Sequence, residues 1–472
     1  MAFEKTLPKK SENVSEWYNA IILQAELAEY GPAKGTMIIR PYGYAIWEEI
    51  QKNLDADFKK RGVENAYFPL FIPESMINKE KHHIEGFSPE LAVVTIGGGE
   101  ELTEKLIVRP TSETIIGTSF SRWVKSWRDL PMILNQWANV VRWEKRTYLF
   151  MRTTEFLWQE GHTAHATHED AVDTEVWAMN AYESLFRNFF ALPGYRGIKS
   201  RGETFAGAEE TISYETLMPE GKALQSATSH DLGQNFAKVF DITFQNKKRE
   251  KEFVWQTSWG LSTRTIGALI LAHGDDKGLR LPPKLAPFQV VIIPVRLDDD
   301  IIKECVFLKE KLVLAGIRVK FDDKDETLGF KINKWEMKGA PLRLEVGKRE
   351  LESGTFKSVR RDNGKENSIN KKSLVKDTKK ILDDIQDNMF EEAEKFLKEN
   401  TYKVNNFNDF KKIMETTRGF LEVSWCENSD CEEKIKQETK ATTRCKIEGN
   451  NSGECIYCGK PSKSKWYFAQ AY

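Results

Sequence analysis

Cysteine is scarce in this sequence and unevenly placed. Of the six cysteines in 472 residues, only Cys305 precedes residue 426, and the other five lie between Cys426 and Cys458. A secreted domain held by disulfides distributes its cysteines through a short chain. A late cluster in a long chain is typical of a metal site instead. Cys305 lies in an apolar helical pattern and is expected to be a core residue.

An excess of charge of either sign is also absent. Lysine and arginine number 70 and aspartate and glutamate 71, so the net charge is −1. Any nucleic acid must therefore bind at local basic patches on a balanced surface. No run approaches the ~20 apolar residues that a membrane span requires, and the first residues contain no apolar signal core. We expect a cytoplasmic protein that does not enter a membrane.

The first part of the chain predicts a mixed α+β unit. Up to about residue 285, strand-like runs and helical stretches alternate without a regular order. The strand-like runs cover 66–72, 105–108 and 131–143, and the helical stretches cover 15–30, 41–58 and 171–190. The lack of regular alternation argues against a doubly wound parallel sheet, so we expect an antiparallel sheet with flanking helices.

A proline-rich stretch at 281–287 marks a domain boundary. The continuous apolar run at 288–295 is typical of a buried parallel strand. The predicted elements that follow are helices at 301–315 and 329–338, strands at 318–321 and 342–346, a hairpin or loop at 358–368 and a charged helix at 371–400. We therefore predict three domains, at 1–285, 286–385 and 386–472, the second of them α/β.

Arginines carry the clearest chemical signal. Arg142 and Arg152 lie beside strand-like runs, as in a β–loop–β unit that holds two phosphate positions. Arginine presents a planar fork that binds carboxylate or phosphate bidentately, which lysine cannot match. Glu144 could accept a hydrogen bond from an adenine amino group. Arg264 precedes an apolar helix at 266–271, a position suited to a terminal phosphate. Taken alone, the first segment could equally form surface ion pairs.

Together these segments resemble motifs 2 and 3 of the class II aminoacyl-tRNA synthetases. Four further segments are similar to prolyl-tRNA synthetase, in its archaeal/eukaryotic-type branch. They are R-P-T-S-E-T at 109–114, E-F-L-W-Q-E-G-H at 155–162, A-T-S-H-D-L-G-Q-N-F at 227–236 and H-G-D-D-K-G-L at 273–279. The resemblance covers nearly the whole chain. It implies ATP-dependent activation of L-proline to prolyl-adenylate, followed by transfer to the 3′ end of tRNA(Pro), by a class II antiparallel-sheet catalytic domain at 1–285.

The resemblance also implies how proline binds. Thr111 and Glu113 would hold its imino group, because a carboxylate is the expected partner of a buried secondary ammonium. His230 and the wall around Trp158 would close a small pocket. Arg142 would bridge the substrate carboxylate and the α-phosphate, so that catalysis rests on alignment and electrostatics. No general base is required.

ATP is assigned to neighbouring residues by the same resemblance. The outer phosphates would be bound by Arg152 and Arg264. Arg142 and Arg264 are the predicted catalytic residues. The predicted ATP-binding set is Arg142, Glu144, Arg152, Gln225, Thr228, Ser262 and Arg264. Mg²⁺ is implied as well, because pyrophosphate leaves with a high negative charge.

The α/β unit resembles the anticodon-binding domain of related synthetases, with the signature K-G-A-P-L-R-L-E-V-G-K-R at 338–349. Arg343, Glu345 and Arg349 are the candidate anticodon contacts, since such side chains can read splayed RNA bases. Alternatively, Arg343 and Glu345 merely alternate outward on an ordinary strand. Pro41 resembles the motif 1 proline, which implies a homodimer, although proline also simply favours the first turn of a helix.

The last domain is expected to bind zinc. Four of its cysteines could coordinate Zn²⁺ tetrahedrally, and the resemblance favours this quartet over one that includes Cys445. The predicted ligands are Cys426, Cys431, Cys455 and Cys458. Two alternatives stay open: a reduced, metal-free domain, and a separate nucleic-acid module that uses the lysines following Cys458.

Several features of the sequence allow other interpretations. A synthetase for threonine or glycine, or a non-catalytic paralogue that binds RNA, would share the fold. The histidines at 162, 165 and 168 could suggest a metal site, and the glycines at 97–99 a phosphate loop, but no Lys-Ser/Thr follows them. The 100 residues between Glu160 and Gly260 leave no room for the large editing domain of bacterial-type relatives. A missing methylene lowers the binding free energy of a substrate in a pocket by only about 1–3 kcal/mol. We therefore predict slow misactivation of alanine or cysteine, without hydrolysis of the mischarged tRNA by the same chain.

Overall fold

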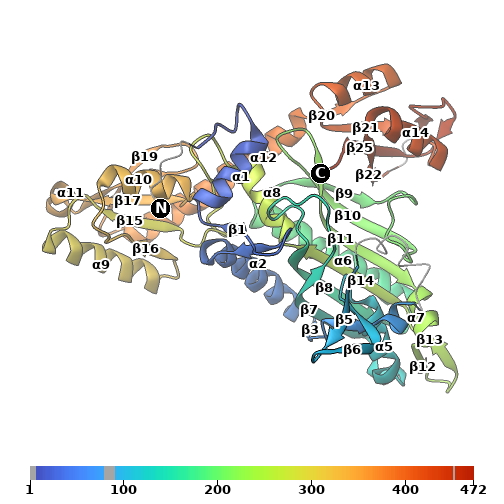
Figure 1. Ribbon diagram of the computed structural model, residues 1–472. Coiled ribbons are helices and arrows are strands. Elements are labelled where there is room, and N and C mark those ends of the chain that lie inside the picture. The colour runs from blue at the N-terminus through green and yellow to red at the C-terminus, as the bar shows by residue number, and fades with distance from the viewer. Residues whose placement is uncertain (1–6, 79–90, 450–451) are drawn as a thin grey trace.

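The protein is organised around three successive sheets; in Figure 1 the second along the chain is at the left, the first is at the lower right and the third lies above the first. The computed structural model describes residues 7–78, 91–449 and 452–472. The first sheet has seven strands in the order β3-β7-β8-β14-β11-β10-β9, and every neighbouring pair is antiparallel except β3 with β7. The predicted antiparallel catalytic sheet is therefore confirmed. Its strands are β3 (Glu64–Asn65), β7 (Met132–Val141), β8 (Glu155–Ala164), β9 (Gly194–Ile198), β10 (Glu210–Leu217), β11 (Ala223–Gly233) and β14 (Gln256–Ser262).

Helices pack on this sheet and form the main core with it. The long helix α6 contacts β11 and β14, and α2 contacts α6. Fully buried tryptophans at 17, 47 and 259 belong to this core. The helices of this unit are α1 (Val14–Gln24), α2 (Pro41–Lys60), α3 (Glu74–Asn78), α5 (Glu113–Trp123), α6 (His168–Asn188), α7 (Asn235–Phe240) and α8 (Arg264–His273), with a 3₁₀ turn, η2 (Trp127–Asp129).

Small sheets complete the first unit. Gly98 and Gly99 have positive φ angles of 64° and 90° and form the turn of the β5–β6 hairpin, so the glycine run is a hairpin turn rather than a phosphate loop. The remaining strands are β1 (Ala28–Tyr30), β2 (Met37–Ile39), β4 (Phe71–Pro73), β5 (Ala92–Gly97), β6 (Glu100–Val108), β12 (Thr243–Gln245) and β13 (Lys251–Phe253).

Two predicted elements were wrong in part. The helix expected at 15–30 ends at Gln24, because Glu26 is left-handed (φ 60°) and the next residues pair with β2 as β1. The strand expected at 66–72 is interrupted between β3 and β4. Side chains replace the ladder there: Phe68 N–H donates to Gln136 Oε1 at 2.5 Å, and Arg109 Nη1 donates to the Phe68 carbonyl at 2.7 Å.

The second sheet follows the boundary at 281–287 and has the order β16-β15-β17-β18-β19. Strand β15 lies between β16 and β17 and is parallel to both, as its continuous apolar sequence predicted. Cys305 is fully buried in this domain, which confirms it as a core residue. The elements are β15 (Val290–Pro294), α9 (Asp299–Leu314), β16 (Val319–Phe321), α10 (Leu328–Met337), β17 (Leu342–Val346), α11 (Lys348–Ser353), β18 (Thr355–Arg360) and β19 (Glu366–Asn370).

The helix α12 (Leu374–Glu399) continues unbroken past residue 385 and is followed by β20, the first strand of the third sheet. The strand order of this sheet is β20-β21-β25-β22. This last sheet lies beside the first, where β22 contacts β9 and β10. Its elements are β20 (Thr401–Lys403), α13 (Phe407–Glu415), β21 (Phe420–Ser424), α14 (Ser429–Thr439), β22 (Ala441–Ile447), β23 (Gly453–Glu454), β24 (Pro461–Ser462) and β25 (Lys465–Gln470). None of the helices described is long and apolar enough to cross a membrane.

Ion pairs join the second sheet to the first unit. Arg361 donates through both Nη atoms to the carboxylate of Asp275, at 2.7 and 2.6 Å, just beyond the end of α8. Arg318 Nη1 lies 3.1 Å from Glu49 Oε2 on α2. These partly buried contacts connect the domain that carries the anticodon signature to the helices beneath the first sheet.

Glu175 gives the first unit a predicted pH dependence. It is 1% exposed on α6, and its Oε1 accepts a hydrogen bond from Asp231 N–H of β11. Burial, reinforced by Glu210 and Asp231, raises its pKa to about 9. Between the ordinary pKa of 4.5 and about 9, the folded state binds one more proton than the unfolded state, so stability falls as pH rises.

We expect Glu175→Gln to flatten this dependence, because the amide oxygen keeps the acceptor while the titrating proton is lost. Urea unfolding of the two proteins at about pH 6 and about pH 8 measures the difference. Glu169→Gln, at the exposed start of the same helix, is the matched control and should leave the pH dependence unchanged. An unaltered slope in Glu175→Gln would contradict the assignment.

Candidate active site

One cavity of about 300 Å³ lies on the first sheet, over β8, β11 and β14. It adjoins a smaller cavity at the loop between β7 and β8, and Arg142 and Arg264 line both. Of the predicted substrate residues, the larger cavity is lined by Thr111, Glu113, Arg142, Trp158, Gln225, Thr228, His230, Ser262 and Arg264. Glu144 and Arg152 line the smaller one. The structure thus brings together around one space every residue predicted to bind proline or ATP.

The acidic end of the cavity is formed by the loop that enters α5. Thr111 Oγ1 donates to Glu113 Oε2, and Glu113 lies in the first turn of the helix, only 8% exposed. Among the described residues, no basic side chain forms an ion pair with Glu113. A buried carboxylate without a cation is costly, so this end of the cavity suits a ligand with a positively charged nitrogen.

Glu160 organises this end, although the sequence did not reveal its role. Its Oε1 accepts from Ser112 Oγ at 2.5 Å and from Gln136 Nε2 at 2.7 Å, and its Oε2 lies 2.9 Å from His162 Nε2. Burial lowers the pKa of His162, but the hydrogen bond and charge of Glu160 outweigh it and leave that pKa above its ordinary value. The available signal was the i, i+2 spacing, which places Trp158, Glu160 and His162 on one face of β8.

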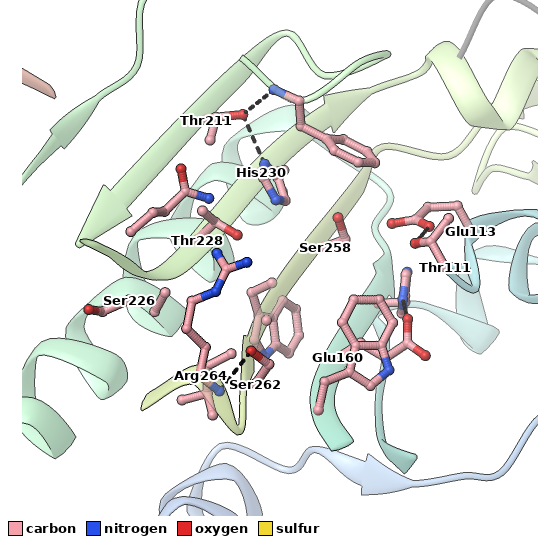
Figure 2. A pocket seen from close by; sticks show the side chains of 18 of the residues that line it. Thr111, Glu113, Glu160, Thr211, Ser226, Thr228, His230, Ser258, Ser262 and Arg264 are labelled. Atoms are coloured by element: carbon pink, nitrogen blue, oxygen red, sulfur yellow. Dashed lines mark hydrogen bonds and ion pairs between the residues drawn. The ribbon is translucent and has the colours of Figure 1, made fainter. Parts of the chain in front are cut away.

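An uncharged wall faces the carboxylate. Burial, with a smaller contribution from His162, lowers the pKa of His230 to about 3, so its imidazole is neutral at physiological pH. Its Nδ1 lies 2.8 Å from Thr211 Oγ1, which also accepts from Phe205 N–H at 3.1 Å. Figure 2 shows His230 and Thr211 on one side of the pocket and Thr111 with Glu113 on another. Sequence reasoning missed Phe205 and Thr211, which carry no motif of their own.

Three arginines make the opposite end strongly positive. Arg264 begins α8, and its Nε donates to the Met151 carbonyl at 3.1 Å. Burial, followed by the charges of Arg142 and Arg152, lowers the pKa of Arg264 to about 10. Glu144 lies 3.4 Å from Arg152 Nε and offsets only part of this charge. Guanidinium groups that repel one another in a partly buried cavity favour an anionic ligand with several phosphates.

Arg142 lies between the two ends. Its Nε donates to the Pro110 carbonyl at 3.2 Å, next to the loop that carries Thr111, and its guanidinium lies 5.6 Å from the Phe156 ring and 5.8 Å from the Trp158 ring. A guanidinium in this place can contact a carboxylate bound at the acidic end and a phosphate bound at the basic end.

The three regularly spaced histidines do not gather. His165 Nδ1 lies 2.6 Å from Asp170 and His168 Nε2 lies 2.6 Å from Asp231, while only His162 lines the cavity. Across 7–78, 91–449 and 452–472, the one group of three or more side chains arranged to hold a metal ion is the cysteine quartet.

The four predicted cysteines do converge in the third domain. Their sulfur atoms all lie within 4.8 Å of one another, with Cys426 Sγ 3.7 Å from Cys431 Sγ and 3.8 Å from Cys458 Sγ. Four sulfurs at about 2.3 Å from one zinc ion lie about 3.8 Å apart in a tetrahedron, so the quartet, completed by Cys455, fits zinc. Cys445 lies outside this group, fully buried on β22.

The candidate anticodon residues lie on β17, the central strand of the second sheet, and on α11, which follows it. Arg343 and Glu345 share a face of β17, with Arg343 Nε 2.9 Å from Glu345 Oε1, and each side chain is 12% exposed. Arg349 lies on α11 and is exposed. Arg343 and Glu345 are therefore paired with each other rather than pointing freely into solvent.

Comparison with known proteins agrees with this geometry. Residues 94–273 match the family model "tRNA synthetase class II core domain (G, H, P, S and T)", residues 289–381 match "Anticodon binding domain" and residues 407–472 match "Prolyl-tRNA synthetase, C-terminal". The first match spans the cavity, the second spans β17 and the third contains the cysteine quartet.

Curated relatives match over their full length. The proline–tRNA ligase of Natranaerobius thermophilus is 48% identical over 100% of this chain and 99% of the relative. The proline–tRNA ligase of Chlorobium chlorochromatii is 52% identical over 99% of each chain, and that of Rubrobacter xylanophilus is 49% identical over 99% of this chain and 98% of the relative. With the antiparallel core and the two-ended cavity, these similarities establish that the chain belongs to the prolyl-tRNA synthetase family of class II aminoacyl-tRNA synthetases.

Proposed function

We propose that the connected cavity is where this proline–tRNA ligase joins L-proline to ATP and then to tRNA(Pro). The supporting observation is its division into two ends: the buried carboxylate of Glu113, which forms no ion pair with a basic side chain among the described residues, and the guanidinium groups of Arg142, Arg152 and Arg264. Proline fits the first end with its ammonium on Glu113 and its ring between Trp158 and His230. ATP fits the second, with its phosphates against the arginines and its nucleoside near Glu144, Gln225, Thr228 and Ser262.

The activation step follows from this placement. An oxygen of the proline carboxylate attacks the α-phosphorus of ATP, the bond to the bridging oxygen breaks, and pyrophosphate leaves. Arg142 binds both reacting groups, so it brings them together and offsets the charge that develops in the transition state. Arg152 and Arg264 hold the outgoing pyrophosphate, whose charge Mg²⁺ is expected to share. In the second step the 3′-terminal hydroxyl of the tRNA attacks the adenylate carbonyl and AMP leaves.

Removing Arg264 should abolish the first step. We expect Arg264→Ala to lower kcat/KM for proline-dependent ATP–pyrophosphate exchange by about 10²- to 10³-fold, because a preorganised charge on the departing group is lost. Exchange measured with each of the twenty amino acids should be dominated by proline in the wild type.

Arg349→Ala is the matched arginine control. It should leave exchange unchanged and raise the KM for tRNA(Pro) in aminoacylation by roughly fivefold, as the loss of one charged hydrogen bond predicts. Exchange dominated by another amino acid would overturn the specificity, and intact exchange in Arg264→Ala would overturn the phosphate role.

The third domain is proposed to hold structural zinc. Four thiolates fill all four positions of a tetrahedral ion, which leaves none for catalysis. Cys431→Ser should lose about one equivalent of zinc per chain, measured by mass spectrometry of the purified protein, and lower its melting temperature. Cys445→Ser removes a cysteine outside the quartet and should keep the zinc. Equal loss in both variants, or a wild type without zinc, would contradict the proposed ligand set.

Editing in cis is not expected. The residues between β8 and β14 form α6, β9, β10, β11, α7 and the β12–β13 hairpin, all parts of the catalytic unit. We expect slow activation of alanine, because a pocket for proline admits a smaller side chain. Purified protein incubated with alanyl-tRNA(Pro) should release alanine no faster than buffer does, and rapid release would contradict this expectation.

The assembly and location are proposals that rest on the family. We propose a homodimer in the cytoplasm, with domains at 1–285, 286–385 and 386–472. Pro41 begins α2, in agreement with the motif 1 resemblance. The three separate sheets support the division into domains.

A further inference from the structure

The loop 199–209 brings the third domain into contact with the proline end of the cavity. It connects β9 to β10, and its residues Glu203 and Phe205 line the cavity. The base of this loop, at Lys199 and Ser200, is 3% exposed at each residue. Neither base residue lines the cavity, so the contacts that hold the base act on the substrate only through the loop.

A carboxylate from the third domain holds Ser200. Ser200 Oγ donates to Glu432 Oε1 at 2.6 Å, and Thr443 Oγ1 donates to the same oxygen at 2.5 Å. Glu432 lies on α14 and Thr443 on β22, 232 and 243 residues from Ser200 along the chain. Hydrogen bonds to a charged acceptor are stronger than those between neutral groups, so this contact fixes the loop base across the domain boundary.

A buried ion cluster holds Lys199. Arg444 of β22 donates through Nε and Nη2 to Glu215 Oε2, at 2.9 and 2.6 Å, and Lys199 Nζ lies 3.5 Å from Glu215 Oε1. The three side chains are at most 4% exposed. Lys199 Nζ is also 3.9 Å from the cavity residue Glu203. Because an unpaired buried charge is strongly destabilising, the cluster holds Lys199 in one place relative to the third domain.

The loop base is connected to the pocket wall by short contacts. Lys199 N–H donates to the Thr211 carbonyl at 2.8 Å. The Thr211 hydroxyl in turn contacts His230 Nδ1 at 2.8 Å and Phe205 N–H at 3.1 Å. Two rings of the proline end are thus held by the segment that the third domain anchors. The phosphate-binding arginines come from the β7–β8 loop and α8 instead.

We propose that Glu432 and Arg444 are positioning residues for proline: the C-terminal domain holds the base of the loop 199–209 and so sets the shape of the proline pocket. The proposal rests on the proposed function of the cavity. It predicts that loosening the anchor weakens proline binding while ATP binding is kept, and that discrimination against alanine declines because the rings no longer close on the larger substrate.

Glu432→Ala tests the anchor. We expect the KM for proline in ATP–pyrophosphate exchange to rise roughly 5- to 20-fold, with the KM for ATP and kcat changed less than about twofold. Glu432→Gln keeps an oxygen that accepts both hydroxyls and should restore most of the proline affinity. Glu433→Ala removes the same charge from the next, exposed residue of α14 and should behave as the wild type.

Ser200→Ala removes the other side of the same contact. It should raise the KM for proline as Glu432→Ala does, and the double variant should be no worse than either single one. An unchanged KM for proline in both variants would overturn the proposal, as would equal increases for proline and ATP or a loss confined to thermal stability. A wild type without proline-dependent exchange would instead overturn the proposed function of the cavity.

Discussion

The pairing of β8 with β14 is the constraint on which the rest of the site depends. Gly161 lies opposite Trp259 in this register, and a Cβ atom at Gly161 would fall 1.9 Å from the indole of Trp259. Only glycine at position 161 therefore leaves space for the buried Trp259 side chain. The Trp259 ring packs against Phe58 and Trp177. The same register aligns Glu160 with Gly260 and Trp158 with Ser262, so residues of the acidic and basic ends of the cavity lie on adjacent strands.

The cavity is electrostatically incomplete by itself. Its acidic end holds a buried carboxylate that forms no ion pair with a basic side chain among the described residues. At its basic end, burial and the charges of Arg142 and Arg152 lower the pKa of Arg264. The proposed placement of proline and ATP supplies the complementary charges at the two ends. The proposed activation step needs no general base, because the proline carboxylate attacks as an anion. The histidines nearest the site contact Glu160 and Thr211.

The domains are joined to this site at separate places. The second domain binds Asp275 through Arg361, beyond the end of the helix that begins at Arg264. The third domain binds Ser200 and Glu215 beside the proline end. The second and third domains therefore contact the first unit at different places, through charged groups that are wholly or partly shielded from water.

The sequence by itself determined the chemistry and the order of the elements. Local patterns identified the helix after Pro41, the buried strand β15 and the four cysteines, because periodicity, capping and ligand spacing are short-range properties. The arginines were recognisable by residue type and by their neighbours in the chain. Tertiary structure alone decided how Glu160 holds Ser112 and how Arg444 holds Glu215, because those partners are 48 and 229 residues apart. It also interrupted the strand predicted at 66–72 at Phe68, whose backbone groups are satisfied by the side chains of Gln136 and Arg109 instead of a neighbouring strand.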